Sequence, residues 1–325
     1  MPWTEDIVGQ LHHFTYGAIT PIFAFAMSFL GSLLGLVSTA RARIATDTRR
    51  RAWLLVLAAW SIGGTGIWVM HFMAMVGFSV QDSPLRFDVP ITVASFIIAV
   101  VTVGLGLFIV GMGRPKLWKV LIGGPITGVS VAFMHYTGMK AMNINGSFEY
   151  KPSLYIASYA IAVVAATVAL WFTVVVRGMI ATTAAAVVMG VAVCGMHYTG
   201  MYAMQVHLAH GTDTVPGVDV NWFLAPIVLF VLVVVIALAS AVMAVPSERE
   251  QAEAAAVRDK IAAGQAIRAE SGAVFGGAPM PGNAVGGTFG GSPSAAPPAQ
   301  GGGKGQAFAA RAANGIADAR RHRGR

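Results

Sequence analysis

Seven long apolar stretches, separated by short polar segments, run through the first three quarters of the chain. They cover residues 16–40, 53–77, 89–112, 117–142, 154–176, 180–205 and 222–245. Each is long enough for a helix across a bilayer core of roughly 30 Å, which takes about 20 residues. Every Asp, Glu, Lys and Arg between residues 16 and 245 lies outside these stretches or at their ends. The pattern predicts an all-α membrane protein with seven transmembrane helices.

The composition agrees with lipid surroundings. Hydrophobic residues make up 56% of the chain and charged residues 11%, against roughly 25% charged residues in a soluble domain. The net charge of +8 is spread over loops and the C-terminal end, so we expect no nucleic-acid partner, which would need one basic folded face. Cys194 is the single cysteine, and this excludes a disulfide framework and a CxxC site.

The loop charges predict a multi-pass protein with its N-terminus outside and its C-terminus in the cytoplasm. Cytoplasmic loops collect Lys and Arg. Nine such residues lie in the first, third and fifth loops or at the adjoining helix ends: Arg41, Arg43, Arg49, Arg50, Arg51, Arg114, Lys116, Lys119 and Arg177. The opposite side holds three, Arg86, Lys140 and Lys151.

Residues 246–325 form a predicted cytoplasmic tail. Ser247 and Glu250 have the spacing of a capping box before an Ala-rich run to about residue 270, which predicts a helix. The Gly, Ala, Pro and Ser residues that follow offer too little apolar surface to offset chain entropy, so this part should be disordered. Its basic end is either solvated or held on anionic lipid of the inner leaflet.

A six-residue motif occurs three times, which is the most specific signal in the chain. The copies are Met70-His71-Phe72-Met73-Ala74-Met75, Met134-His135-Tyr136-Thr137-Gly138-Met139 and Met196-His197-Tyr198-Thr199-Gly200-Met201. The repeating unit is a pair of helices, with the motif near the outer end of the second.

Helical geometry places the repeated residues on one face. At about 100° per residue, positions seven before, four after and seven after each histidine lie within about 40° of it. The first of these positions holds Gly64, Gly128 or Gly190, and the last holds Phe78, Met142 or Met204. Glycine on such a stripe lets a neighbouring helix approach closely. We therefore expect His71, His135 and His197 to converge inside the bundle.

These motifs resemble the MHYT family of bacterial integral membrane sensor domains, named for the Met-His-Tyr-Thr tetrad that stands intact twice. The resemblance covers about residues 10–210. It implies a sensor of the bacterial inner (plasma) membrane, in which Met and His side chains hold a metal, copper, that binds a diatomic gas such as O2, CO or NO. The first copy departs from the tetrad with Phe72-Met73 in place of Tyr-Thr.

The expected organisation has four parts. Residues 1–15 are an outer segment, 16–210 the six-helix sensor domain, 211–245 an outer loop with the seventh helix, and 246–325 the tail. The cyclase, phosphodiesterase and kinase signatures that follow the domain in many relatives do not occur after Val245. We therefore expect no enzymatic activity and a cytoplasmic signalling partner that reads the tail.

The candidate metal ligands are the motif histidines and methionines: His71, His135, His197, Met70, Met75, Met134, Met139, Met196 and Met201. Imidazole binds copper, and thioether sulfur favours Cu(I). A site seldom takes more than four or five ligands, so three His and one or two Met would fill it. The alternatives are packing for Met and a helix–helix hydrogen bond for His. For Tyr136 and Tyr198, a paired buried hydroxyl competes with a role in ligand binding.

Four functions fit these residues. The first is a sensor in which ligand binding at the outer cluster shifts the helix pairs and so the cytoplasmic side. The others are a copper carrier or channel, a haem protein that uses two motif histidines, and a scaffold without a ligand. Proton pumps usually carry mid-span carboxylates or bases, and none is present in these stretches.

The orientation gives a first prediction. A reporter that is active only in the cytoplasm, fused after Arg325, should be active because the basic loops hold the C-terminus inside. Activity of an export-dependent reporter at the same position would reverse the assignment.

Overall fold

A computed structural model describes residues 7–8, 11–81, 83–113, 116–208, 214–219, 222, 226, 229, 233–240 and 248–275. Contacts divide the chain into two units, Met1–Ala263 and Gly264–Arg325. The helical bundle belongs to the first unit.

Six helices of the described chain are long and apolar enough to cross a membrane, so the protein is a multi-pass membrane protein. They are α1 (Ile19–Ile44), the continuous run of α2 (Thr48–Ala59), η1 (Trp60–Val69) and α3 (Met70–Val76), α4 (Val89–Gly111), α5 (Leu117–Lys140), α6 (Pro152–Val175) and α7 (Met179–Ala203). These six confirm the first six predicted spans to within a few residues.

The predictions for the seventh span and the tail fall partly outside the described residues. Within the stretch 222–245, residues 233–240 are described and helical. The helix predicted after it is present as α9 (Glu248–Phe275) and continues a few residues past its expected end. The disordered remainder of the tail stays a prediction.

The six spans form a closed ring in chain order. α1 packs on η1, η1 on α4, α4 on α5, α5 on α6, and α6 on α7, while α7 returns to α1. The three motifs therefore lie on alternate members of the ring, namely α3, α5 and α7. This arrangement follows from the helix-pair repeat and gives the bundle an approximate threefold symmetry.

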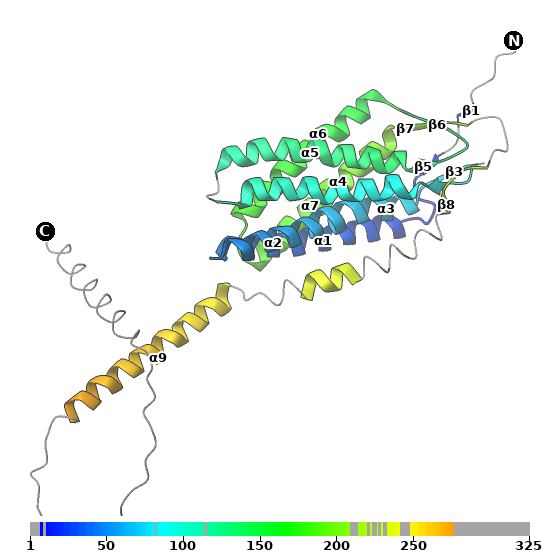
Figure 1. Ribbon diagram of the computed structural model, residues 1–325. Coiled ribbons are helices and arrows are strands. Elements are labelled where there is room, and N and C mark those ends of the chain that lie inside the picture. The colour runs from blue at the N-terminus through cyan, green and yellow to red at the C-terminus, as the bar shows by residue number, and fades with distance from the viewer. Residues whose placement is uncertain are drawn as a thin grey trace, which may run out of the picture. The chain divides into compact units, whose positions relative to one another are not determined.

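Short antiparallel strands gather at one end of the bundle (Figure 1). They are β1 (Ile7–Val8), β2 (Leu11–His12), β3 (Ser79–Val80), β4 (Arg86–Phe87), β5 (Met142–Asn143), β6 (Gly146–Tyr150), β7 (Met204–Leu208) and β8 (Val218–Asp219). Their sheets have the orders β1-β7-β6, β2-β3 and β5-β4-β8. Three of these strands follow directly on the ends of motif helices, so pairing ties the helix ends together.

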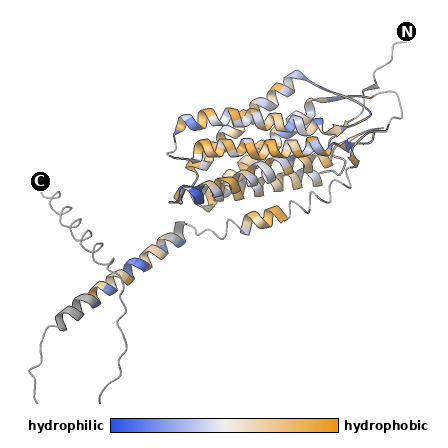
Figure 2. Ribbon diagram, viewed as in Figure 1, coloured by the Kyte–Doolittle hydropathy of each residue, from blue (hydrophilic) through white to orange (hydrophobic). Residues whose placement is uncertain are grey.

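Arginines connect the helices at the opposite end, where the start of α2 is coloured hydrophilic (Figure 2). Arg43 of α1 donates to the carbonyl of Thr173 in α6 and, at 2.7 Å, to that of Val176 directly after α6. Arg51 donates to the carbonyls of Ala42 and Ala45. The last carbonyls of a helix have no partner within the helix, so these bonds satisfy two helix ends and join α1 to α2 and α6.

The first repeat departs from α-helical geometry. η1 is a ten-residue π-helix, in which hydrogen bonds connect residues i and i+5 and the residues turn less per step. Close backbone approach occurs at Gly63, against the carbonyl of Ala99, and at Gly31 of α1, where an added Cβ would meet the backbone of Gly66 in η1. The stripe expected from α-helical spacing is thus wrong at Gly64, where an added Cβ would meet only side chains of α4.

The far end of the stripe also needs correction. α5 ends at Lys140 and α7 at Ala203, so Met142 and Met204 lie on strands β5 and β7. Both side chains are nevertheless buried. The helical face shared by the repeats therefore ends at the methionine four residues after each histidine.

Glycine packing in the second repeat gives a prediction. A Cβ at Gly128 would lie 2.5 Å from Cα of Val163 and 2.6 Å from the carbonyl oxygen of Ala162. Gly128→Ala should therefore separate α5 from α6 and destabilise the protein by about 1–3 kcal/mol, the usual cost of overpacking. The measurement is thermal unfolding in detergent.

The control is Gly195→Ala in α7, where an added Cβ meets nothing within 4 Å. Alanine is favoured over glycine in a helix by about 1 kcal/mol, so this variant should be neutral or more stable. Equal losses in both variants would contradict close packing at Gly128.

Candidate metal centre

Three buried histidines from three helices meet inside the bundle. His71 of α3, His135 of α5 and His197 of α7 are each 1% exposed. Nδ1 of His71 lies 3.0 Å from Nδ1 of both His135 and His197. The ring centroids are 4.8–5.0 Å apart, and the rings are close to perpendicular. The predicted convergence is present, and we refer to these residues as the histidine triad.

The triad lies near the strand-covered end of the bundle. Each histidine stands five or six residues before the last residue of its helix, which is about 9 Å at a rise of 1.5 Å per residue. Because the motif helices alternate around the ring, equivalent faces point to a common axis. One helix pair alone could supply only one imidazole.

Two motif glycines contact the outer edges of imidazole rings from neighbouring helices. A Cβ at Gly138 would overlap Nε2 of His71, and a Cβ at Gly200 would overlap Nε2 of His135. Each glycine is three residues after the histidine of its own copy, and the first copy has Ala74 there. These glycines were not among the predicted site residues, although their recurrence in the two intact motifs was a readable signal.

The hydrogen-bonding groups of the triad are in conflict. A neutral imidazole carries a proton on one nitrogen and a lone pair on the other. Nδ1 of His71 therefore offers a single proton or a single lone pair to two neighbouring Nδ1 atoms at 3.0 Å, so it can complete one hydrogen bond and must share it with the second neighbour. In addition, Nε2 of each ring is buried without a hydrogen-bond partner in the described part of the chain. Buried polar atoms without partners are costly.

The donor set fits a metal ion. Three unprotonated imidazole nitrogens within 4.8 Å of one another can all bind one cation, which takes the place of the missing protons. Nitrogen ligands at about 2.0 Å from a tetrahedral ion lie roughly 3.3 Å from one another, slightly more than the 3.0 Å from Nδ1 of His71 to each of the other two. In the described residues, these three form the cluster of His, Cys, Asp or Glu side chains suited to a metal.

The six motif methionines are all in the buried core. Met75, Met134, Met139, Met196 and Met201 belong to the main core cluster, and Met70 packs with Ala24 and Ala74 in a smaller one. Their side chains are at most 2% exposed. Packing therefore accounts for the position of each methionine, and their role as thioether ligands stays a prediction.

The residue after each histidine links the repeat to its next helix. The Tyr136 hydroxyl lies 2.6 Å from Oγ of Ser158 on α6. In the first copy, which has Phe72 instead, Nε1 of Trp68 donates to Oγ of Ser95 on α4 at 3.0 Å. The hydroxyl lost at Phe72 is thus replaced by an indole from the preceding turn, and the same helix-to-helix contact is kept.

Tyr198 has the same place in the third copy. Its hydroxyl is buried and has no hydrogen-bond partner among the described residues. The position equivalent to Ser158 would fall at residues 220–221, which lie outside them. A paired hydroxyl therefore explains Tyr136, whereas the choice between pairing and ligand binding stays open at Tyr198.

An uncharged aromatic layer adjoins the triad on the strand side. His13 packs against Phe78 and Tyr202, with ring centroids 5.7 and 4.6 Å apart. Burial lowers the pKa of His13 below its usual value, so its ring is neutral at pH 7. Burial also raises the pKa of Tyr150 to about 12. Neither group adds a charge beside the triad at neutral pH.

Comparison with known proteins agrees with the repeat. The MHYT family model, described as a bacterial signalling protein N-terminal repeat, matches residues 64–124, 128–186 and 190–257. Each match begins at the glycine seven residues before a motif histidine. No solved structure matches the chain.

The curated relatives are bacterial signalling proteins. The bifunctional diguanylate cyclase/cyclic di-GMP phosphodiesterase MucR of Pseudomonas aeruginosa is 33% identical over 73% of this chain and 35% of its own length. The cyclic di-GMP phosphodiesterase NbdA of the same organism is 36% identical over 46% of this chain and 20% of its own. The signaling protein YkoW of Bacillus subtilis is 28% identical over 60% and 25%. The chain spans about a third or less of each relative.

The contact between histidine and glycine gives a prediction. Gly200→Ala should lower the thermal midpoint because its Cβ displaces the His135 ring. In the double variant with His135→Ala that overlap is gone, so the two losses should not add. We expect a coupling of about 0.5–3 kcal/mol in a double-mutant cycle, as found for residues in contact. Strict additivity would contradict the packing of His135 on Gly200.

Proposed function

Because the chain belongs to the MHYT family of bacterial membrane signalling proteins, we propose that it is a sensor whose histidine triad holds a copper ion. The observation that supports this proposal is the convergence of three Nδ1 atoms in a buried site. When bound, copper would supply an open coordination position for a diatomic gas such as O2, CO or NO, or a change of redox state. The role of the chain is then binding, not catalysis.

Copper is favoured over harder cations by the donors at hand. Neutral imidazole suits Cu, Zn, Fe and Ni, whereas Mg and Ca prefer oxygen. The buried methionines of the motifs add soft sulfur to the surroundings, and sulfur selects Cu(I). One or two of them would complete the ligand set after a small side-chain rotation, since methionine is unbranched and flexible.

The packing of the triad speaks against haem. A haem bound through two histidines would need its flat ring between them, but the Nδ1 atoms are 3.0 Å apart. The outer ring edges of His71 and His135 are likewise in contact with glycines of neighbouring helices. Binding of a single metal ion does not require either of these contacts to be broken.

A carrier or channel has less support than a sensor. A copper pathway would need polar or thioether groups on the side of the triad away from the strands. There the described residues one turn before each histidine are Ile67, Val131 and Val193, and they line an apolar cavity. A cation that leaves the triad in this direction would meet mainly aliphatic side chains, with only two thioethers and two hydroxyls among them. Exchange of three imidazoles for so few ligands is costly in a low-dielectric interior.

The signal would reach the cytoplasm through the helices of the ring. Arg43 and Arg51 join α1, α2 and α6 at the end opposite the strands, so a shift of one helix pair at the triad would move this end as well. α9 and the tail would then present the change to a cytoplasmic partner. Two relatives are named as cyclic di-GMP enzymes. We therefore propose a protein of cyclic di-GMP signalling as the cytoplasmic partner.

Copper content tests the proposal. After expression with copper and purification without chelators, the parent should carry copper. His135→Ala or His197→Ala should reduce it to background, because two imidazoles hold a metal far more weakly than three. Met201→Ala should lower it less, since other thioethers lie nearby, while the lost packing costs about 2–5 kcal/mol of stability in a soluble core. Metal analysis and thermal unfolding on the same samples separate the two effects.

The matched control is His207→Ala on strand β7, outside the triad, which should leave copper unchanged. Background copper in the parent, or equal loss in the His207 variant, would remove the copper site. An absorption spectrum of the same preparation shows whether haem is bound.

A further inference from the structure

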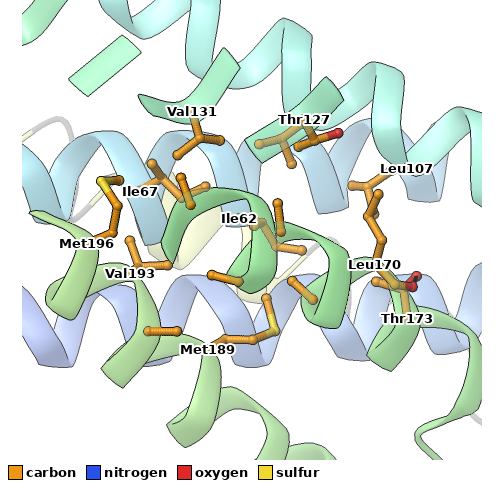
Figure 3. A pocket seen from close by; sticks show the side chains of 16 residues that line it. Ile62, Ile67, Leu107, Thr127, Val131, Leu170, Thr173, Met189, Val193 and Met196 are labelled. Atoms are coloured by element: carbon orange, nitrogen blue, oxygen red, sulfur yellow. Dashed lines mark hydrogen bonds between the residues drawn. The ribbon is translucent and has the colours of Figure 1, made fainter. Parts of the chain in front are cut away.

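An apolar cavity lies at the centre of the ring (Figure 3). It offers about 50 Å³ of space to the centre of a water-sized sphere, and one water needs roughly 10–15 Å³ by this measure. Its walls are aliphatic side chains and two methionines, with Thr127 and Thr173 as the hydroxyl groups. A cavity of this kind has room for a diatomic molecule or a xenon atom and few partners for water.

The cavity adjoins the triad along the bundle axis. Ile67, Val131 and Val193 all line it, and each stands four residues before a motif histidine on the same helix face. Met196, the residue before His197, is also part of the wall. The near end of the cavity is thus about one helical turn, roughly 5 Å, from the imidazole rings.

A second apolar hollow, on an exposed side of α6 and α7, adjoins this cavity. It offers about 420 Å³ by the same measure and is lined by residues of these two helices only. Ala165, Met189 and Ala192 line both spaces. Ala165 and Ala192 are half-buried, so these small side chains form the partition between the membrane side and the bundle centre.

We propose that a small uncharged apolar molecule enters this protein from the lipid between α6 and α7 and binds in the central cavity beneath the histidine triad. Dioxygen, carbon monoxide and nitric oxide belong to this class. Apolar solutes leave water for hydrocarbon, so the bilayer concentrates them at the hollow, and the thin alanine partition is the narrowest point of the route. As a route to the metal, the inference rests on the proposed function; as an apolar binding site, it does not.

Xenon tests the site without any metal. The protein, labelled with 13C at the methionine methyl groups, is placed in lipid nanodiscs, and spectra are recorded under xenon and under argon at low pressure. The signals of Met189 and Met196, assigned with Leu variants, should shift with xenon more than that of Met139, which is buried but lines neither space. A silent Met196 signal would overturn the cavity site, even if Met189 responds from the lipid side.

The entrance is tested with matched variants of adjacent residues. A blocked entrance slows exchange, whereas a filled cavity removes binding, so the Met196 shift is followed in time after a step in xenon pressure. Ala192→Phe places a large ring in the partition and should slow or abolish this shift, whereas Val191→Phe, whose residue is 58% exposed and lines neither space, should leave its rate and size unchanged. Ala165→Leu narrows the partition from α6 and should slow the shift, and it replaces the phenylalanine variant if that variant does not fold. An unchanged rate and size of the Met196 shift in both partition variants would overturn entry between α6 and α7. If xenon binds but the protein carries no copper, the cavity site stands and the metal site is overturned. If the protein carries copper but xenon does not bind, the metal site stands and the cavity site is overturned.

Discussion

The fold depends on placing three polar imidazoles at one buried point inside a hydrophobic bundle. In lipid, a polar group must find its partner within the protein, because water is not available. Nδ1 of His71 is shared by His135 and His197 at 3.0 Å, and it can complete a hydrogen bond with only one of them. The site is thus polar, buried and incompletely satisfied. Such a site persists only where the surrounding structure holds its residues in place. In this protein the three repeated helix pairs hold the histidines in place.

The histidines are held by contacts between different copies of the repeat, which no single copy contains. Two of the three histidines rest on the motif glycine of another copy, His71 on Gly138 and His135 on Gly200. The first copy departs from the pattern in its π-helix and in the residues Phe72 and Ala74. Its histidine is also the one that contacts both others through Nδ1. π-helical turns are frequent at functional sites, and here the turn lies directly before that central histidine.

Much of this arrangement could be predicted from the sequence because it follows from spacing. Six spans and the meeting of three histidines come from apolar length and from a motif repeated in register. The π-helix could not be found in this way, since its apolar residues fit an α-helix equally well. The two-residue strands carry no alternation to detect. Compensation of Phe72 by Trp68 depends on a contact with Ser95 across two helices, and the sequence of one copy does not contain it.

The apolar layer beneath the triad separates molecules by charge. A cation bound by the three imidazoles would have to cross Ile67, Val131 and Val193 to move inward, and an ion without ligands in such surroundings costs many kcal/mol. A neutral diatomic molecule crosses the same layer with little penalty, since it has no charge to desolvate. The aliphatic ring would therefore retain a metal and admit a gas. That asymmetry would connect the triad to the proposed lipid-side entrance without opening a path for ions across the membrane.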